Sequence, residues 1–206
     1  MTRLCIFARA PVLGEVKSRL ARTFGEVAAL AAYRELCATA FDHLAKVPGI
    51  ETELWIAGAA DHPDVVEWSA RWDLPISRQQ GADLGARMRF AIDACLGDGM
   101  PGLVVGTDCP TITASYLQHA AAELDSHDLV LGPAEDGGYG LIGLRLPAPT
   151  LFEDMPWGSD RVMSETLARA KKAGLDYRLL ETVWDVDEPE DWVRFSSSRP
   201  AIVKPG

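Results

Sequence analysis

The chain has 206 residues, 48% of them hydrophobic and 24% charged, a composition typical of a globular protein with one sizeable core. Its formal net charge of −10 argues against a nucleic-acid-binding surface. Any site for a phosphorylated ligand must therefore use local cations, supplied by Lys, Arg or a metal ion. No charge-free stretch reaches the ~18 residues that a membrane span requires.

Residues 4–8 form an apolar run typical of a buried strand, and a loop is expected at residues 10–23. Residues 25–47 place apolar side chains at i, i+3 and i+4 spacing, which predicts a long amphipathic helix. A second strand is expected at residues 53–57. Residues 61–72 begin with acids and a proline, as the start of a capped helix does.

The middle of the chain continues the same alternation. We expect a short strand at residues 74–77, a loop followed by a helix within residues 81–99, and a strand at residues 103–106. Residues 113–126 form a helical pattern that Thr113 or Ser115 can cap. Residues 128–146 are then expected to hold two strands around a glycine-rich turn.

Residues 159–174 predict a helix with Gly174 as its carboxyl-terminal stop. A last strand is expected at residues 177–186 and a short helix at residues 188–195, followed by a loose polar tail, 196–206. The alternation of strands and helices predicts a three-layer α/β/α protein, Rossmann-like, with a mostly parallel mixed sheet. No linker or repeat divides the chain, so we expect one domain over residues 1–206.

The cysteines and the amino-terminal sequence bear on location. The four cysteines form no CxxC motif and no zinc-like spacing, so we expect reduced thiols, as in cytosolic proteins. The apolar part of MTRLCIFARAP is too short for a signal peptide. We therefore expect a cytoplasmic protein that acts on small molecules.

The loop after the first strand, RAPVLGEVKSRL, lies where doubly wound folds place a nucleotide's phosphates. It matches neither the P-loop nor the GxGxxG pattern. It offers Gly14 for close approach and Lys17 and Arg19 as cations. The alternative is a solvated loop with ordinary surface charges.

Asp108 follows the apolar run LVVG, and the carboxyl ends of parallel strands are where such sheets bind ligands. A second acidic cluster, WDVDEPED, follows the last predicted strand. Asp108 and Asp187, from two adjacent strand ends, could share one Mg²⁺ or Mn²⁺, because these ions favour carboxylate oxygens. The alternatives are turn formation by Asp108 and helix capping by Asp187.

Three further segments are candidates for ligand contacts. The turn PAEDGGYG places Asp136 where it could hold a sugar hydroxyl, although a hairpin turn explains it too. In MPWGSD, Trp157 is either core or a stacking wall, and Ser159 or Asp160 a helix cap. The segment from Gln80 to Arg87 could receive a base or ribose.

Taken in order, FARAPVLGEVKSRL, DLGARM, GTDCPTIT, LGPAEDGGYGLIGLR, PWGSDRV and DVDEPEDW resemble the nucleotide-diphospho-sugar transferase superfamily, which has the GT-A fold. The resemblance covers nearly the whole chain. Within the superfamily, the motifs resemble the selenodomain-associated transferases, also called arsenosugar-biosynthesis glycosyltransferases. The layout is also similar to that of 2-phospholactate guanylyltransferase.

The resemblance assigns expected roles to individual residues. It implies that Asp108 and Asp187 bind the metal, Mg²⁺ or Mn²⁺, that Lys17 and Arg19 belong to the nucleotide-phosphate loop, and that Asp136 lies in the acceptor-side turn. From their chemistry we expect Asp108, Asp136 and Lys17 to be catalytic. The nucleotide would be bound by Ala10, Pro11, Gly14, Lys17, Arg19, Gln80, Gly81, Gly85, Arg87 and Thr107. The acceptor substrate would be bound by Asp136, Gly137, Gly138, Trp157 and Ser159.

The favoured activity is metal-dependent transfer of a sugar from a nucleotide-diphospho-sugar to a small-molecule acceptor, with Asp136 as candidate general base. The alternative is nucleotidyl transfer, in which a phosphorylated acceptor attacks a nucleoside triphosphate and pyrophosphate leaves. In that case Arg87 and Arg161 are candidates for the acceptor phosphate. A third possibility is a nucleotide-binding domain without catalysis.

Overall fold

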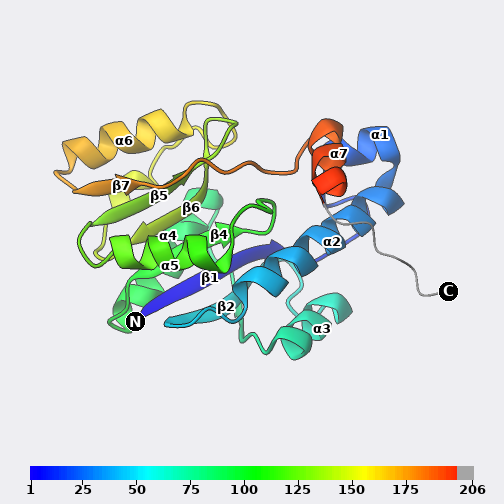
Figure 1. Ribbon diagram of the computed structural model, residues 1–206, viewed down its shortest axis with the longest axis horizontal. Helices are drawn as coiled ribbons and strands as arrows, with labels where there is room; N and C mark the ends of the chain where they lie inside the picture. The colour runs from blue at the N-terminus through cyan, green and yellow to red at the C-terminus, as the bar shows by residue number, and fades with distance from the viewer. Residues whose placement is uncertain (199–206) are drawn as a thin grey trace.

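The computed structural model describes residues 1–198, in which seven strands form one sheet in the order β3-β2-β1-β4-β6-β5-β7 (Figure 1). The strands are β1 (Thr2–Arg9), β2 (Ile50–Ala57), β3 (Ile76–Arg78), β4 (Gly102–Gly106), β5 (Leu129–Pro133), β6 (Tyr139–Leu144) and β7 (Tyr177–Leu179). Strand β6 runs antiparallel to both of its neighbours, β4 and β5, whereas the other strand pairs are parallel. The sheet is therefore mixed and mostly parallel, as predicted.

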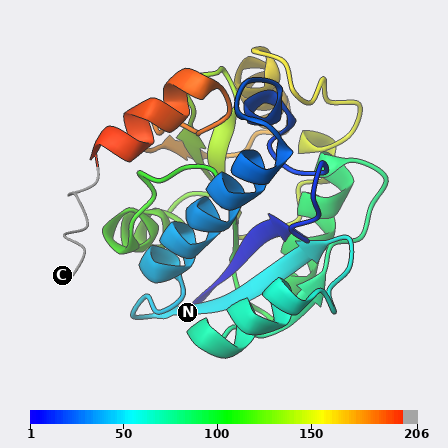
Figure 2. The ribbon, with the colours of Figure 1, turned by 90° about the vertical axis from the view of Figure 1, so that its right-hand side faces the viewer.

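Helices cover both faces of the sheet, which confirms the three-layer α/β/α architecture (Figures 1 and 2). Strand β1 shows why, because alternate side chains of a strand point to opposite faces. Leu4 and Ile6 pack in the core that includes α2 (Glu26–Leu44), α3 (Pro63–Trp72) and α5 (Ala114–Glu123). Cys5 and Phe7 pack in the core that includes α4 (Leu84–Gly97) and α6 (Val162–Lys172).

Several helix ends follow the predicted chemistry. Thr113 caps α5 by accepting a hydrogen bond from the Tyr116 amide, and Gly174, with φ of 70°, follows the end of α6. The caps expected at Ser159 and Asp160 are not formed, because α6 begins one residue later, after Arg161, with no side-chain cap. Short η1 (Pro149–Leu151) lies between β6 and α6.

The predicted loop at residues 10–23 is wrong in its second half, where α1 (Ser18–Phe24) forms. This helix has seven residues and buries one side chain fully, Leu20, so it lacks a clear apolar periodicity. Helix α7 (Pro189–Ser198) also runs further than expected and includes residues 196–198 of the predicted tail. The rest of that tail, 199–206, lies outside the described residues.

The predicted last strand is the largest correction. Within residues 177–186 only β7 pairs along its length, and a single bridge joins Val183 to Ala134. The chain then crosses above the ends of the neighbouring strands to reach α7, which lies beside α1 (Figure 1). Within residues 1–198, no helix is long and apolar enough to cross a membrane.

Candidate functional site

A cleft of about 530 Å³ opens at the carboxyl ends of β1 and β4. Its walls come from the loop before α1, the first turn of α4, the β5–β6 turn, the loop before α6 and the segment before α7. A volume of this size is typical of small-molecule sites, and this edge of the sheet is where α/β proteins bind ligands. The cleft is therefore the candidate active site.

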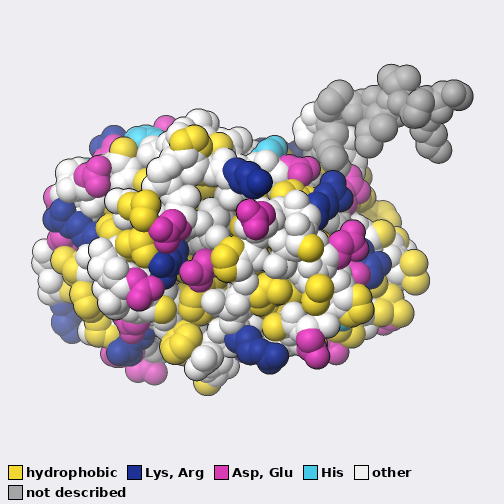
Figure 3. Space-filling model, turned by 90° about the horizontal axis from the view of Figure 1, so that it is seen from below, with side chains coloured by type: hydrophobic (Ala, Val, Ile, Leu, Met, Phe, Trp, Pro, Cys, Tyr) yellow, Lys and Arg dark blue, Asp and Glu magenta, His cyan; other side chains and the backbone are white. Residues whose placement is uncertain are grey.

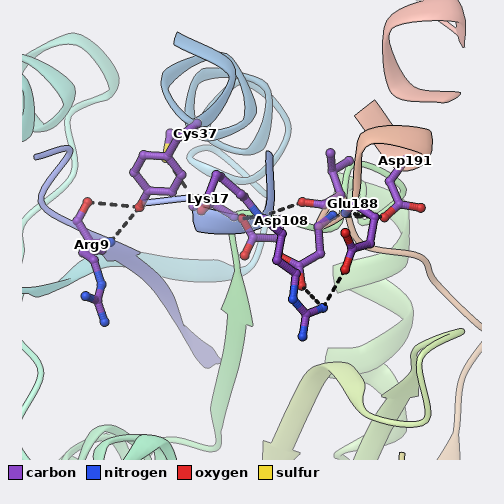
Figure 4. Close-up of polar contacts among 11 residues, drawn as sticks. Arg9, Lys17, Cys37, Asp108, Glu188 and Asp191 are labelled. Carbon is purple, nitrogen blue, oxygen red and sulfur yellow. Dashed lines mark hydrogen bonds and ion pairs between the residues drawn. The ribbon is translucent and has the colours of Figure 1, made fainter. Parts of the chain in front are cut away.

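Lys17 and Asp108 meet in the middle of this cleft (Figure 4). The Lys17 ammonium lies 2.8 Å from Asp108 Oδ1 and donates to the Val186 carbonyl oxygen at 2.6 Å. Its side chain is only 5% exposed, whereas that of Asp108 is 44% exposed. Burial lowers the pKa of Lys17, but Asp108, Asp187 and Asp185 outweigh this effect and raise it. The charged form of Lys17 is therefore favoured in the folded protein.

Asp187 lies beside Asp108, although their strands are not adjacent. Strands β6 and β5 separate β4 from β7, so the expectation of two adjacent strand ends is wrong. The crossing segment brings Asp187 into place instead, because the Val186 amide donates to the Asp108 carbonyl oxygen at 2.9 Å. Arg19 pairs with Asp187 at 2.7 Å and with Glu188 at 3.2 Å.

Helix capping explains only part of the DVDEPED motif. The Asp191 carboxylate accepts hydrogen bonds from the amides of Asp187 and Glu188, and this fixes the start of α7. Pro189 occupies the first helical position, where a missing N–H is tolerated. The side chains of Asp185 and Asp187 are left to line the cleft.

Four carboxylates, those of Asp108, Asp136, Asp185 and Asp187, line this part of the cleft. Burial, together with the neighbouring charges of Asp136, Asp187 and Asp108, raises the pKa of Asp185 to about 6. A concentration of negative charge this large needs a compensating cation, which Lys17 and Arg19 only partly provide.

The donor set fits a hard divalent ion that also binds a substrate. Among residues 1–198, no three His, Cys, Asp or Glu side chains are arranged to hold a metal by themselves. Mg²⁺ is usually held by one or two carboxylates and completes its shell with water and substrate phosphates. Asp108 and Asp187 could supply two such carboxylates. The arrangement is therefore suited to an ion that is shared with a phosphate ligand.

The β5–β6 turn packs against the loop before α6. Gly137 has φ of 88°, and its carbonyl oxygen accepts a hydrogen bond from the Met163 amide. An added Cβ on Gly137 would lie 2.4 Å from the Asp160 backbone oxygen. Asp136 accepts a hydrogen bond from the Gly138 amide at 2.9 Å and keeps its carboxylate at the cleft. Gly137 therefore has a packing role, whereas Asp136 and Gly138 line the cleft.

Trp157 forms a wall of the cleft and is also part of the packing. Its ring meets the Tyr139 ring edge-on, with centroids 6.4 Å apart. An added Cβ on Gly85 would lie 2.5 Å from the indole, so this glycine makes room for the wall. The indole N–H is buried and has no hydrogen-bond partner within residues 1–198. Ser159, also in the lining, donates to the Pro156 carbonyl oxygen.

The predicted nucleotide residues divide into two groups. Lys17, Arg87 and Thr107 line the cleft. Of the other seven, Ala10 lines a small side pocket next to the cleft and Arg19 pairs with Asp187. The following predicted residues are outside the described lining of the cleft: Ala10, Pro11, Gly14, Arg19, Gln80, Gly81 and Gly85.

Sequence reasoning missed several residues of the lining. Arg9 ends β1 in both the cleft and the side pocket, and within the described chain its guanidinium is in no ion pair. Gln79, next to the predicted Gln80, donates to the carbonyl oxygens of Ala8 and Trp55. Tyr33 hydrogen-bonds both backbone groups of Arg9 (Figure 4). Arg9 could have been found, because it is the polar residue that ends the first apolar run.

The fold is that of nucleotide-diphospho-sugar transferases. A crystal structure from Desulfovibrio desulfuricans G20, described as a "putative nucleotide-diphospho-sugar transferase", is 30% identical, with a TM-score of 0.84 over 98% of this chain and 90% of that one. A family model described as "Uncharacterized protein conserved in bacteria (DUF2064)" matches residues 40–159. The chain belongs to this family.

More distant structures share the fold alone. CMP:2-keto-3-deoxy-manno-octonic acid synthetase complexed with CTP is 13% identical, with a TM-score of 0.60 over 96% of this chain and 98% of that one. 4-Diphosphocytidyl-2C-methyl-D-erythritol synthase from Anaerococcus prevotii is 11% identical, with a TM-score of 0.62 over 96% and 97%. No curated protein matches the sequence.

Proposed function

We propose that this protein transfers a sugar from a nucleotide-diphospho-sugar, with Mg²⁺ or Mn²⁺, to a hydroxyl group of a small molecule. The observation that carries the proposal is the placement of charge in the cleft, where Arg9 and Arg87 lie beside the side pocket with Glu15 and Lys17 lies at Asp108. Every Lys and Arg of the described lining lies in the first 87 residues, at Arg9, Lys17 and Arg87. From residue 134 onward the described lining contains carboxylates and no cation.

The basic end suits the diphosphate of the donor. Arg9 and Arg87 line both the cleft and its side pocket, at the ends of β1 and β2 and the start of α4. Neither guanidinium is in an ion pair with a described residue, and Arg87 donates only to the Gly81 carbonyl oxygen. Free guanidinium groups bind phosphate oxygens well, often with two parallel hydrogen bonds.

Asp108 and Asp187 would hold the metal ion, which would neutralise charge on the diphosphate as it leaves. Lys17 and Arg9 would stabilise the same charge. Because this charge grows as the bond to the sugar breaks, fixed cations here favour the transition state over the bound donor.

The acidic end suits an acceptor that carries hydroxyl groups. The acceptor oxygen would bond to the anomeric carbon of the sugar as the bond to the diphosphate breaks, and its proton would pass to a carboxylate. Asp136 is the candidate base, and Asp185 is a second one because its pKa, about 6, lies near neutral pH. Trp157 offers an apolar face against which a sugar ring can stack.

Nucleotidyl transfer to a phosphorylated acceptor is the second candidate. Two proteins with this fold support it, since one is a synthetase complexed with CTP and the other is named for a diphosphocytidyl product. Against it, an acceptor phosphate beside Asp136 and Asp185 would be repelled. Arg161, expected to bind such a phosphate, is absent from the described lining.

The experiment is a thermal-shift panel of UDP-, GDP-, CDP-, ADP- and dTDP-sugars and the nucleoside triphosphates, each with and without Mn²⁺. A ligand at a hundred times its Kd adds about 2.7 kcal/mol of stability. For a chain of this size that raises the Tm by roughly 5–10 °C. We expect a Mn²⁺-dependent shift with one nucleotide-sugar and a smaller shift with its triphosphate.

A shift with a triphosphate alone would favour nucleotidyl transfer instead. A shift with neither, or one that Mn²⁺ leaves unchanged, would contradict the proposal. Once a donor is known, release of the nucleoside diphosphate in the presence of candidate acceptors separates an enzyme from a domain that only binds nucleotide.

A further inference from the structure

The position of the Lys17 ammonium is the basis of this inference. It lies 2.8 Å from Asp108 Oδ1 and 2.6 Å from the Val186 carbonyl oxygen, in a cleft whose lining includes the carboxylates of Asp108, Asp136, Asp185 and Asp187. Within residues 1–198 this carboxylate oxygen, buried from solvent, has no hydrogen-bond donor beyond that ion pair. Lys17 therefore stands where a cation bound to Asp108 would stand.

The backbone and burial of Lys17 hold the ammonium there. Lys17 has φ of 48° and ψ of 49°, a left-handed conformation that residues with a Cβ rarely adopt. Such a conformation persists when surrounding contacts enforce it, and here the enforcing contacts are the ion pair and the hydrogen bond to Val186. The 5% exposure of the side chain leaves little room for other positions without a change in the site.

Simultaneous binding of an ammonium and a divalent ion to this carboxylate oxygen is unfavourable. Mg²⁺ bonds its ligands at about 2.0–2.1 Å, and its two charges would repel an ammonium held at the same carboxylate. The charge of Lys17 also cancels part of the negative field that would attract the ion. Arg19 has a comparable but more exposed position at Asp187, 2.7 Å away, so its effect is weaker.

We propose that Lys17 keeps divalent cations off Asp108 until a nucleotide binds. The phosphates of the nucleotide attract the ammonium away from Asp108, and the ion enters together with them. Lys17 thereby makes the site specific for a metal–nucleotide complex over the free ion. This inference rests on the proposed function, because it takes a nucleotide diphosphate as the ligand that moves Lys17.

The test measures Mn²⁺ binding to the ligand-free protein by electron paramagnetic resonance of the unbound ion. Lys17→Met and Lys17→Gln remove the charge, and both keep an unbranched stem. Lys46→Met is the matched control, since Lys46 is exposed and is not part of the cleft lining. We expect weak binding by the wild type and Lys46→Met, and at least tenfold tighter binding by both Lys17 variants. Asp108→Asn added to Lys17→Met should abolish the gain.

The same titration of the wild type is then repeated with UDP, GDP, CDP and ADP in turn. We expect one of them to raise the Mn²⁺ affinity of the wild type at least tenfold, and to raise that of Lys17→Met much less. Circular dichroism confirms that each variant is folded. If one Lys17 variant does not fold, the other one provides the measurement.

Two results would overturn the inference while leaving the proposed function intact. One is tight Mn²⁺ binding by the ligand-free wild type, and the other is unchanged Mn²⁺ affinity in both folded Lys17 variants. If the Lys17 variants gain affinity through Asp108 but no diphosphate changes the wild type, then the nucleotide of the proposed function is wrong. In that case the inference that the metal ion enters together with the nucleotide is wrong as well.

Discussion

The backbone amide of Val186 donates a hydrogen bond to the carbonyl oxygen of Asp108 at 2.9 Å. This bond joins the end of β4 to the segment that crosses from β7, although its two residues are 78 positions apart in the sequence. Val186 is fully buried, so the bond is shielded from water. It sets Asp187 beside Asp108 and therefore determines whether the two carboxylates can share an ion.

Asp108→Asn and Asp187→Asn should each reduce Mn²⁺-dependent nucleotide affinity at least tenfold, because each removes a charged ligand of the ion. Asp125→Asn is the control, since Asp125 is an exposed carboxylate outside the cleft lining. Isothermal titration with and without Mn²⁺ makes the comparison. If both variants bind as the wild type does, the domain binds nucleotide without using these residues.

Asp185→Asn should stabilise the metal-free protein at neutral pH. Because the folded-state pKa of Asp185 is about 6 and an unfolded Asp titrates near 4, folding favours the protonated acid. The wild type therefore loses stability as pH rises from about 4 to 6, whereas Asn has no charge to bury. We expect a gain of about 1–2 kcal/mol at pH 7.5 and almost none at pH 4.

Urea denaturation of both proteins at these two pH values measures that difference. Equal gains at pH 4 and pH 7.5 would show that the effect comes from packing and not from the carboxylate charge.

Gly85→Ala should destabilise the protein although it lies in a helix. Alanine favours a helix by up to about 1 kcal/mol over glycine, but its Cβ would lie 2.5 Å from the Trp157 ring. Overpacking of this kind costs about 1–3 kcal/mol, so the clash outweighs the propensity. Gly97→Ala, in the same helix, meets no atom within 4 Å and should stabilise or be neutral. Thermal melts of the pair would contradict this account if Gly85→Ala were the more stable.

The four thiols should react slowly with thiol reagents in the folded protein. All four cysteines are free and buried, as the sequence predicted for reduced thiols. Burial raises the pKa of Cys37 to about 12, so its reactive thiolate is scarce at pH 8. We expect Ellman's reagent to label no thiol rapidly in the native state and four after unfolding. Rapid labelling of Cys37 in native protein would show that α2 opens readily.

The sequence predicts the sheet well because buried strands leave a strong local pattern. The runs that became β1, β2 and β4 are apolar and short, and Asp108 stands out because it lies two residues past the end of β4. Other features depend on contacts distant in sequence. The predicted last strand runs past the end of β7, since the crossing segment also buries apolar side chains at intervals, those of Leu180, Val183 and Val186.

The ion pair between Lys17 and Asp108 within the site could not be predicted from the sequence either. Lys17 and Asp108 were both expected there, but as ligands of phosphate and metal, and nothing local shows that they would pair with each other. On the face of the molecule seen from below in Figure 3, charged side chains of both signs are scattered over the surface. The number of charged residues in the sequence does not distinguish Arg9, which lines the cleft, from an arginine elsewhere on the surface.

The most direct test is anomalous diffraction at the manganese edge from crystals grown with Mn²⁺ and the nucleoside diphosphate of the identified donor. We predict one peak about 2.0–2.2 Å from an Asp108 carboxylate oxygen, shared with the diphosphate, and a Lys17 ammonium that contacts phosphate. A nucleotide bound in the cleft with its metal elsewhere, or with the Lys17–Asp108 ion pair intact, would contradict the account.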